Sequence, residues 1–117
     1  MGIGVLGHEA PSLIYRGYLN AHDVARLRRL GGVGNTCAQF FDADGVLLDT
    51  DLNQRAISIG LEGLAAIGLV VAAASGRQKA PAILGALRGG HVDVLISDDE
   101  AIEAVLELHA QRGNVAR

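Results

Sequence analysis

The sequence predicts one α/β domain built on a parallel sheet, with a β-hairpin added to it. Strand-like and helix-like segments alternate in the second half of the chain, which implies parallel strands. Half of the 117 residues are apolar but only four are aromatic, so the core consists of Val, Leu, Ile and Ala, as in tightly packed α/β layers. The length fits one domain, because a chain of this size buries roughly two-thirds of its unfolded surface.

The first elements expected are a short strand and a helix. Residues 1–12 are glycine-rich and begin almost at once with an apolar run, which predicts a strand. Residues 20–32 predict a helix, because Asn20 is a good N-cap and the glycine pair at 31–32 ends the pattern. The apolar residues expected on one face of this helix are Val24, Leu27 and Leu30.

A hairpin is expected next. The runs at 33–41 ("VGNTCAQFF") and 45–48 ("GVLL") are rich in strand formers, and the turn sequence "DADG" lies between them. Asp and Gly supply the backbone chemistry that a tight turn needs.

The second half predicts two strands and two helices. The continuous apolar run at 68–75 indicates a strand covered on both faces, and residues 92–97 ("VDVLIS") indicate the next buried strand. Residues 80–90 predict the helix between them, with proline near its start and a glycine pair at its end. Residues 101–110 predict the last helix. Its expected buried stripe is Ile102, Val105 and Leu106.

Composition excludes several function classes. The net charge is −3 and the longest basic stretch is "RLRR" at 26–29, so direct nucleic-acid contact is not expected. Cys37 is the only cysteine, which suits a reducing cytoplasm and a small buried hydrophobic role. No apolar run reaches the ~18 residues of a membrane span, so a cytoplasmic protein is expected. The four histidines lack metal-ligand spacing, and Asp98 and Asp99 are interpreted as a helix cap.

One short motif suggests an enzyme. Residues 41–50 ("FDADGVLLDT") resemble the nucleophile loop of haloacid-dehalogenase-type phosphatases, with Asp42 as nucleophile and Asp44 as acid/base. Ser75, Lys79 and the acids after Ser97 would complete a Mg²⁺-dependent site. However, the run before Asp42 is too polar for a central strand. This phosphatase is the alternative hypothesis.

A second resemblance covers the whole chain. In order, the sequence contains "GNTCAQFFDADG", "LNQRAISIGLEGLAAI", "AASGRQK", "AILGALRGG" and "VLISDDE". This series closely resembles the effector-binding domain of SorC-type, also grouped as DeoR-type, sugar-responsive bacterial transcription regulators. The resemblance implies a Rossmann-like layer related to sugar-phosphate isomerases and deaminases, such as ribose-5-phosphate isomerase. It also implies a carbohydrate-binding module without enzymatic activity, catalytic residues or cofactor.

Four residues are expected to form the effector site. The loop "SGRQK" joins a strand to a helix, where backbone N–H groups and the helix dipole favour an anion. Lys79 is the only lysine among ten basic residues. The resemblance implies that Gly76 and Lys79 hold the phosphate of a phosphosugar. Ser75 replaces a glycine of the family, and Asn35 replaces an acid expected to face sugar hydroxyls.

The resemblance also sets expectations about domains and partners. Full regulators of this kind carry an N-terminal helix-turn-helix, and residues 1–117 correspond to the later half of the effector domain, truncated and without a DNA-binding domain. Half a domain leaves a sheet edge and apolar faces uncovered, which predicts self-association into an oligomer. The expected partners are therefore a phosphorylated sugar and further copies of the chain.

Overall fold

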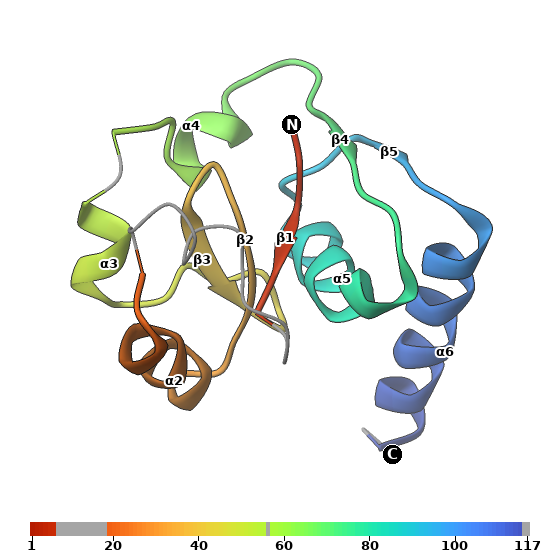
Figure 1. The fold of residues 1–117 in the computed structure, drawn as a ribbon. Helices are drawn as coiled ribbons and strands as arrows, with labels where there is room; N and C mark the ends of the chain where they lie inside the picture. The colour runs from red at the N-terminus through yellow and green to blue at the C-terminus, as the bar shows by residue number, and fades with distance from the viewer. Residues whose placement is uncertain (7–18, 56, 116–117) are drawn as a thin grey trace.

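A computed structural model describes residues 1–6, 19–55 and 57–115 as a mixed α/β fold with two small sheets (Figure 1). A three-stranded antiparallel sheet has the order β1-β2-β3, and a two-stranded parallel sheet pairs β4 with β5. The elements are β1 (Gly4–Val5), α2 (Ala21–Arg29), β2 (Gly32–Thr36), β3 (Gln39–Asp42), α3 (Asp51–Gln54), α4 (Leu61–Ala65), β4 (Val71–Ala73), the 3₁₀ helix η1 (Arg77–Lys79), α5 (Ala80–Arg88), β5 (Val94–Ile96) and α6 (Asp99–Val115). Of the strand predicted in residues 1–12, the structure shows only β1. Residues 7–12 lie outside the described residues.

Helix α2 begins and ends close to the predicted positions. The Asn20 side chain accepts from the N–H of Asp23, and the Asp23 carboxylate accepts from the N–H of Asn20, which forms a reciprocal capping box. Gly31 follows the helix with a φ of +87°, a conformation that glycine adopts without strain. Val24 and Leu27 are buried as expected, but Leu30 is 48% exposed because it is already the C-cap residue.

The predicted strand over 33–41 is divided by a turn. Residues Cys37 and Ala38 have φ values of 51° and 59° and connect β2 to β3 as a two-residue hairpin loop. Cys37 is therefore a half-buried turn residue rather than part of the core.

The "DADG" sequence forms a turn, as predicted. One carboxylate oxygen of Asp42 accepts from the N–H of Asp44 at 2.9 Å and from that of Val46 at 3.0 Å. Beyond the turn, however, the predicted strand is reduced to a single antiparallel bridge between Phe41 and Leu47. Arg112 of α6 holds the turn from outside by donating to the Ala43 carbonyl at 3.2 Å and the Asp44 carboxylate at 3.0 Å.

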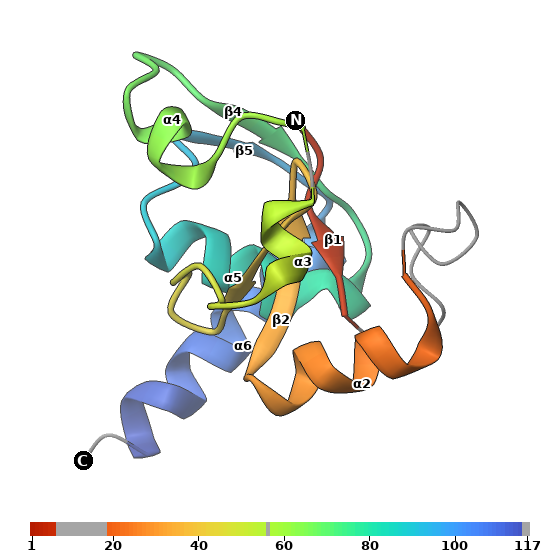
Figure 2. The ribbon, with the colours of Figure 1, turned by 90° about the vertical axis from the view of Figure 1, so that its left-hand side faces the viewer.

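The antiparallel sheet separates two apolar clusters, because consecutive strand residues point to opposite faces. Phe40 belongs to the cluster shared with α2 and α3, whereas Phe41 belongs to the larger cluster shared with α5 and α6. Figure 2 shows the same arrangement from the side, with α2 on one side of β2 and α5 on the other. The smaller cluster consists of Leu6, Leu19, Val24, Leu27, Phe40, Leu48 and Leu52.

Helix α5 lies directly on the backbone of the hairpin. A Cβ on Gly34 of β2 would collide with Ala82, and a Cβ on Gly85 would come within 2.8 Å of the Asp42 carbonyl oxygen. These glycines allow the helix and strands to approach far more closely than larger residues would.

Strands β4 and β5 are parallel, with Val71 opposite Val94 and α5 as the crossover between them. Their inward residues are packed, but Val94 is 43% exposed and Ile96 61% exposed. The expectation that both faces are covered is therefore wrong for the described part of the chain. The larger apolar cluster includes Ala72 and the buried residues of α5, so α5 packs on the inner face only.

The N-terminal residues extend the parallel sheet. The N–H of Ala73 donates to the Met1 carbonyl at 2.8 Å, and Gly2 forms a parallel bridge to Ala73, so the N-terminal residues run along β4.

The predicted buried stripe of α6 is only partly right. Val105 is buried, whereas Ile102 and Leu106 are exposed and the smaller Ala101 and Ala104 take the buried positions.

Candidate functional site

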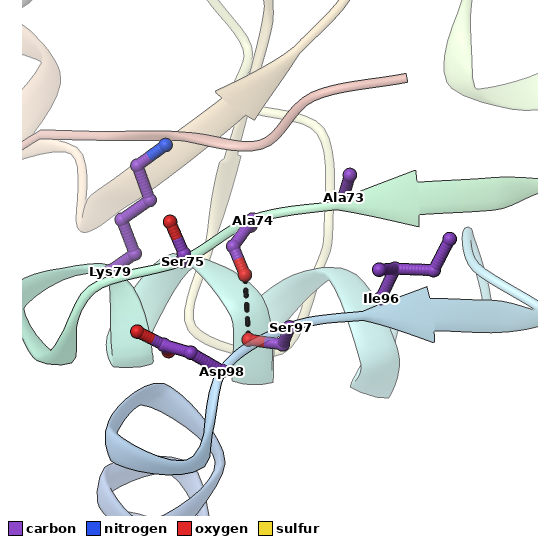
Figure 3. A pocket seen from close by; sticks show the side chains of 7 residues that line it. All are labelled: Ala73, Ala74, Ser75, Lys79, Ile96, Ser97 and Asp98. Atoms are coloured by element: carbon purple, nitrogen blue, oxygen red, sulfur yellow. Dashed lines mark hydrogen bonds between the residues drawn. The ribbon is translucent and has the colours of Figure 1, made fainter.

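An open pocket lies where β4 and β5 end, at the carboxyl edge of the parallel sheet (Figure 3). This edge is where open α/β sheets usually bind ligands. The cavity has a volume of about 430 Å³, which falls in the range of small-molecule sites. Its lining residues are Ala73, Ala74, Ser75, Lys79, Ile96, Ser97 and Asp98.

The loop from Ser75 to Lys79 forms one wall of this pocket. Gly76 has a φ of +99°, which only glycine adopts at little cost, and this turns the chain from β4 into η1. The N–H of Lys79 donates to the Gly76 carbonyl at 3.1 Å and closes the first helical turn. Helix α5 follows without a break, so the loop occupies the N-terminal end of a continuous helical segment.

Lys79 supplies the positive charge of the pocket. Its side chain is half-buried and rises beside the Ser75 hydroxyl in Figure 3. Within the described residues, no carboxylate lies within 4.0 Å of its ammonium group. The charge is therefore available to a ligand.

Two residues of β5 and its exit complete the pocket. The Ser97 hydroxyl donates to the Ala74 carbonyl at 2.6 Å and links the ends of the two strands. One carboxylate oxygen of Asp98 accepts from the N–H of Ala101 at 3.0 Å, which confirms the predicted cap on α6. The predicted effector site did not include Ser97 and Asp98, although the phosphatase hypothesis placed the acids after Ser97 together with Ser75 and Lys79. Their place directly after an apolar strand was the available signal, because strand ends of parallel sheets meet at one edge.

The structure brings together three of the four expected site residues. Ser75 and Lys79 line the pocket and Gly76 connects them. Asn35 does not line it. It lies on β2 opposite Gly4 of β1, and its side chain occupies the space above that glycine.

Asp42 is not placed to act with these residues. Its carboxylate serves the turn, and its carbonyl faces Gly85 in the middle of α5. Gly85 lies six residues beyond Lys79, a rise of about 9 Å along a helix. The described residues also contain no group of three His, Cys, Asp or Glu side chains suited to a metal ion. The geometry does not support the phosphatase hypothesis.

Fold and pocket together define a class: a mixed α/β domain with an open ligand pocket at the carboxyl ends of its parallel strands. The family described as "Putative sugar-binding domain" matches residues 1–107. The chain belongs to this family, whose members include transcriptional regulators of the SorC and DeoR groups rather than enzymes. The predicted family is confirmed by this match, and the relatives named below are transcriptional regulators.

Individual relatives agree with this assignment. The chain is similar to a DeoR family transcriptional regulator from Listeria monocytogenes, with a TM-score of 0.83 and 35% identity over 89% of this chain and 42% of that one. It is similar to the full-length sorbitol operon regulator SorC from Klebsiella pneumoniae, with a TM-score of 0.78 and 28% identity over 90% of this chain and 34% of that one. It is 34% identical over 106 residues to the erythritol catabolism regulatory protein EryD of Brucella abortus, covering 91% of this chain and 33% of that protein.

The chain thus spans about a third of the length of the curated relatives it matches. None of the helices in the described ranges combines the length and the hydropathy needed to cross a bilayer.

Proposed function

We propose that residues 1–117 are part of the effector-binding domain of a bacterial transcription regulator, and that the effector is a phosphorylated sugar. The observation that carries the ligand class is the position of Lys79. Its ammonium group has no carboxylate partner among the described residues, and it lies at the start of a helical segment beside an open pocket. Since the regulated DNA lies in the bacterial cytoplasm, that location is part of the proposal.

The phosphate is assigned to the loop from Ser75 to Lys79. The N–H groups of Arg77 and Gln78 belong to the first turn of the helical segment, where no preceding carbonyl of that segment can accept from them. Such groups, with the helix dipole, favour an anion. Lys79 adds a point charge and Ser75 a hydroxyl donor. Apolar contact from Ile96 would border the sugar carbons.

Asn35 is assigned to the sugar hydroxyls, although it does not line the pocket. It neighbours Gly4 of β1, and β1 in turn packs against η1, which contains Lys79. A sugar held by its phosphate at Lys79 would therefore extend across β1 to reach the amide of Asn35. An amide both donates and accepts, which suits a hydroxyl partner.

Self-association is the third part of the proposal. The outward face of β4 and β5 presents Val71, Val94 and Ile96 to solvent, and a parallel sheet is normally covered on both faces. A second copy of the chain would cover this face. Because Ile96 also lines the pocket, the covering copy would add a wall to the site.

Calorimetric titration with a panel of sugar phosphates and the matching free sugars tests the ligand class. Lys79→Ala should weaken binding of the phosphates about ten- to a hundredfold, the value of one charge-assisted hydrogen bond. Lys79→Arg should restore part of it, since a planar guanidinium does not replace a point charge. Arg55→Ala is the control for loss of a positive charge, because its side chain pairs with Asp51 and does not line the pocket. Equal affinity of the wild type and Lys79→Ala would remove the loop from the site, and binding by neither would overturn the proposal.

A further inference from the structure

Asp98 connects the proposed phosphate loop to the last helix through a single atom. Its Oδ1 accepts from the N–H of Gly76 at 3.3 Å and from the N–H of Ala101 at 3.0 Å. The first donor lies in the loop after β4 and the second in the first turn of α6. Figure 3 shows the Asp98 carboxylate on the opposite side of the Ala74–Ser75 segment from the Lys79 ammonium.

We propose that Asp98 is a positioning residue of the pocket, which orients the loop for phosphate and couples that loop to α6. The inference rests on the proposed function, because the loop is assigned there to the phosphate. It goes further in naming a residue that acts through the loop and a helix that responds to it.

The orientation follows from peptide geometry. The described chain has no cis peptide bond, and in a trans peptide the N–H and C=O point in opposite directions. By holding the N–H of Gly76, Asp98 therefore fixes the orientation of the whole peptide between Ser75 and Gly76. Glycine permits many other orientations of this peptide. Without Asp98 the peptide would be free to rotate, and Ser75 and the start of η1 would no longer be held in one position beside the proposed phosphate.

The coupling follows from the second hydrogen bond. Oδ1 is shared, so any shift of the loop changes the geometry of the bond to Ala101, which is fully buried at the start of α6. A further link runs in parallel, because Arg77 of η1 forms an ion pair with Glu107 of α6. That pair is about half-exposed at each side chain, so it is the weaker connection. The two hydrogen bonds of Asp98 are part-buried, so Asp98 forms the stronger connection between the loop and α6.

Amide hydrogen exchange of the ¹⁵N-labelled chain without ligand reads the connection directly. Asp98→Ala should speed exchange at both Gly76 and Ala101 by about tenfold or more, as expected for loss of a hydrogen bond to a charged group. Asp98→Asn keeps an acceptor oxygen in the same place and should stay within about threefold of wild type. Asp98→Ser should still cap α6 but be too short for Gly76, so only Gly76 should exchange faster. Asp99→Ala is the control. The Asp99 carboxylate accepts from the N–H of Glu100, so its removal should leave the exchange rate of Gly76 unchanged.

The same variants are then titrated with a sugar phosphate. Asp98→Ala should bind about tenfold more weakly than wild type, with rescue by Asp98→Asn. Unchanged Gly76 exchange in both Asp98→Ala and Asp98→Ser would overturn the role of Asp98, as would a failure of Asp98→Asn to restore protection. If the exchange pattern holds but wild type binds no phosphate ligand, the proposed function fails while the link from loop to helix stands.

Discussion

Asn53 hydrogen-bonds both backbone groups of Phe40, as a neighbouring strand would. Its Oδ1 accepts from the N–H of Phe40 at 2.7 Å, and its Nδ2 donates to the Phe40 carbonyl at 3.1 Å and to the Leu48 carbonyl at 2.8 Å. The side chain is buried between β3 and the segment that follows the "DADG" turn. One side-chain amide thus makes hydrogen bonds to β3 that a neighbouring strand would otherwise make.

Asn53→Ala should destabilise the protein by roughly 2–4 kcal/mol. The substitution leaves the N–H of Phe40 and the carbonyl of Leu48 without these partners in a buried site, whereas the Phe40 carbonyl still accepts from the N–H of Leu48 at 3.0 Å. Each group that loses its partner costs about 1–3 kcal/mol before the structure relaxes. Urea unfolding followed by circular dichroism measures the change. Gln54→Ala, at the exposed next position, should stay within about 0.5 kcal/mol of wild type. Equal stability of the two variants would contradict the assigned role.

Ala38→Gly should stabilise the protein by about 1 kcal/mol. Ala38 has a φ of 59°, and a non-glycine residue held in this region costs on the order of 1–3 kcal/mol, offset by the greater chain entropy of glycine. Thermal unfolding should show a higher midpoint. Ala25→Gly on the exposed side of α2 should instead lower stability by about 1 kcal/mol. A fall in midpoint for both variants would show that the turn is not strained.

The wild-type chain should form a dimer or larger species at micromolar concentration, with a mass well above 12.1 kDa by light scattering. Val71→Thr combined with Val94→Thr should shift the mass toward the monomer, because both side chains lie on the uncovered sheet face. Leu30→Gln removes a comparably exposed apolar residue at the end of α2 and should not change the mass. A 12.1 kDa wild-type species across this range would exclude the interface.

Asn35→Asp should change which sugar phosphate is preferred more than it changes phosphate affinity. The substitution converts a group that donates and accepts into one that only accepts, and it does so one strand away from the proposed phosphate loop. Calorimetry on the same panel should therefore reorder the sugars while inorganic phosphate binds as before. A uniform loss across all sugars, without reordering, would argue against contact with hydroxyls.

Local signals allowed most elements to be predicted from the sequence. Asn20 and the glycine pair defined α2, and strand, helix, strand, helix in the second half gave the parallel pair. The turn at Cys37 was missed because Cys-Ala lacks the Asn-Gly signature of such loops, so tertiary contacts must stabilise it. One such contact is the Ser58 hydroxyl, which donates to the Cys37 carbonyl at 2.7 Å.

Other errors concern which apolar residues are covered. Periodicity identifies an apolar stripe but not the distance to its neighbour, and α6 packs against α5 through Ala101 and Ala104 rather than through Ile102. The loop residues Ser75, Gly76 and Lys79 could be proposed from the sequence because glycine and lysine have distinct backbone and charge chemistry. Asp98 was interpreted as a helix cap or, in the phosphatase hypothesis, as an acid of a Mg²⁺ site. Its contact with Gly76 was not predicted, because nothing in its local sequence indicates a partner 22 residues away.

The glycine contacts of α5 have a mechanical consequence. At Gly34 there is no space for a side chain between β2 and Ala82, and at Gly85 there is none between the helix and β3. Lys79 directly precedes α5 and Asn35 lies on β2, so these close contacts fix the spacing between the two residues. The proposed sugar phosphate would have to match this spacing.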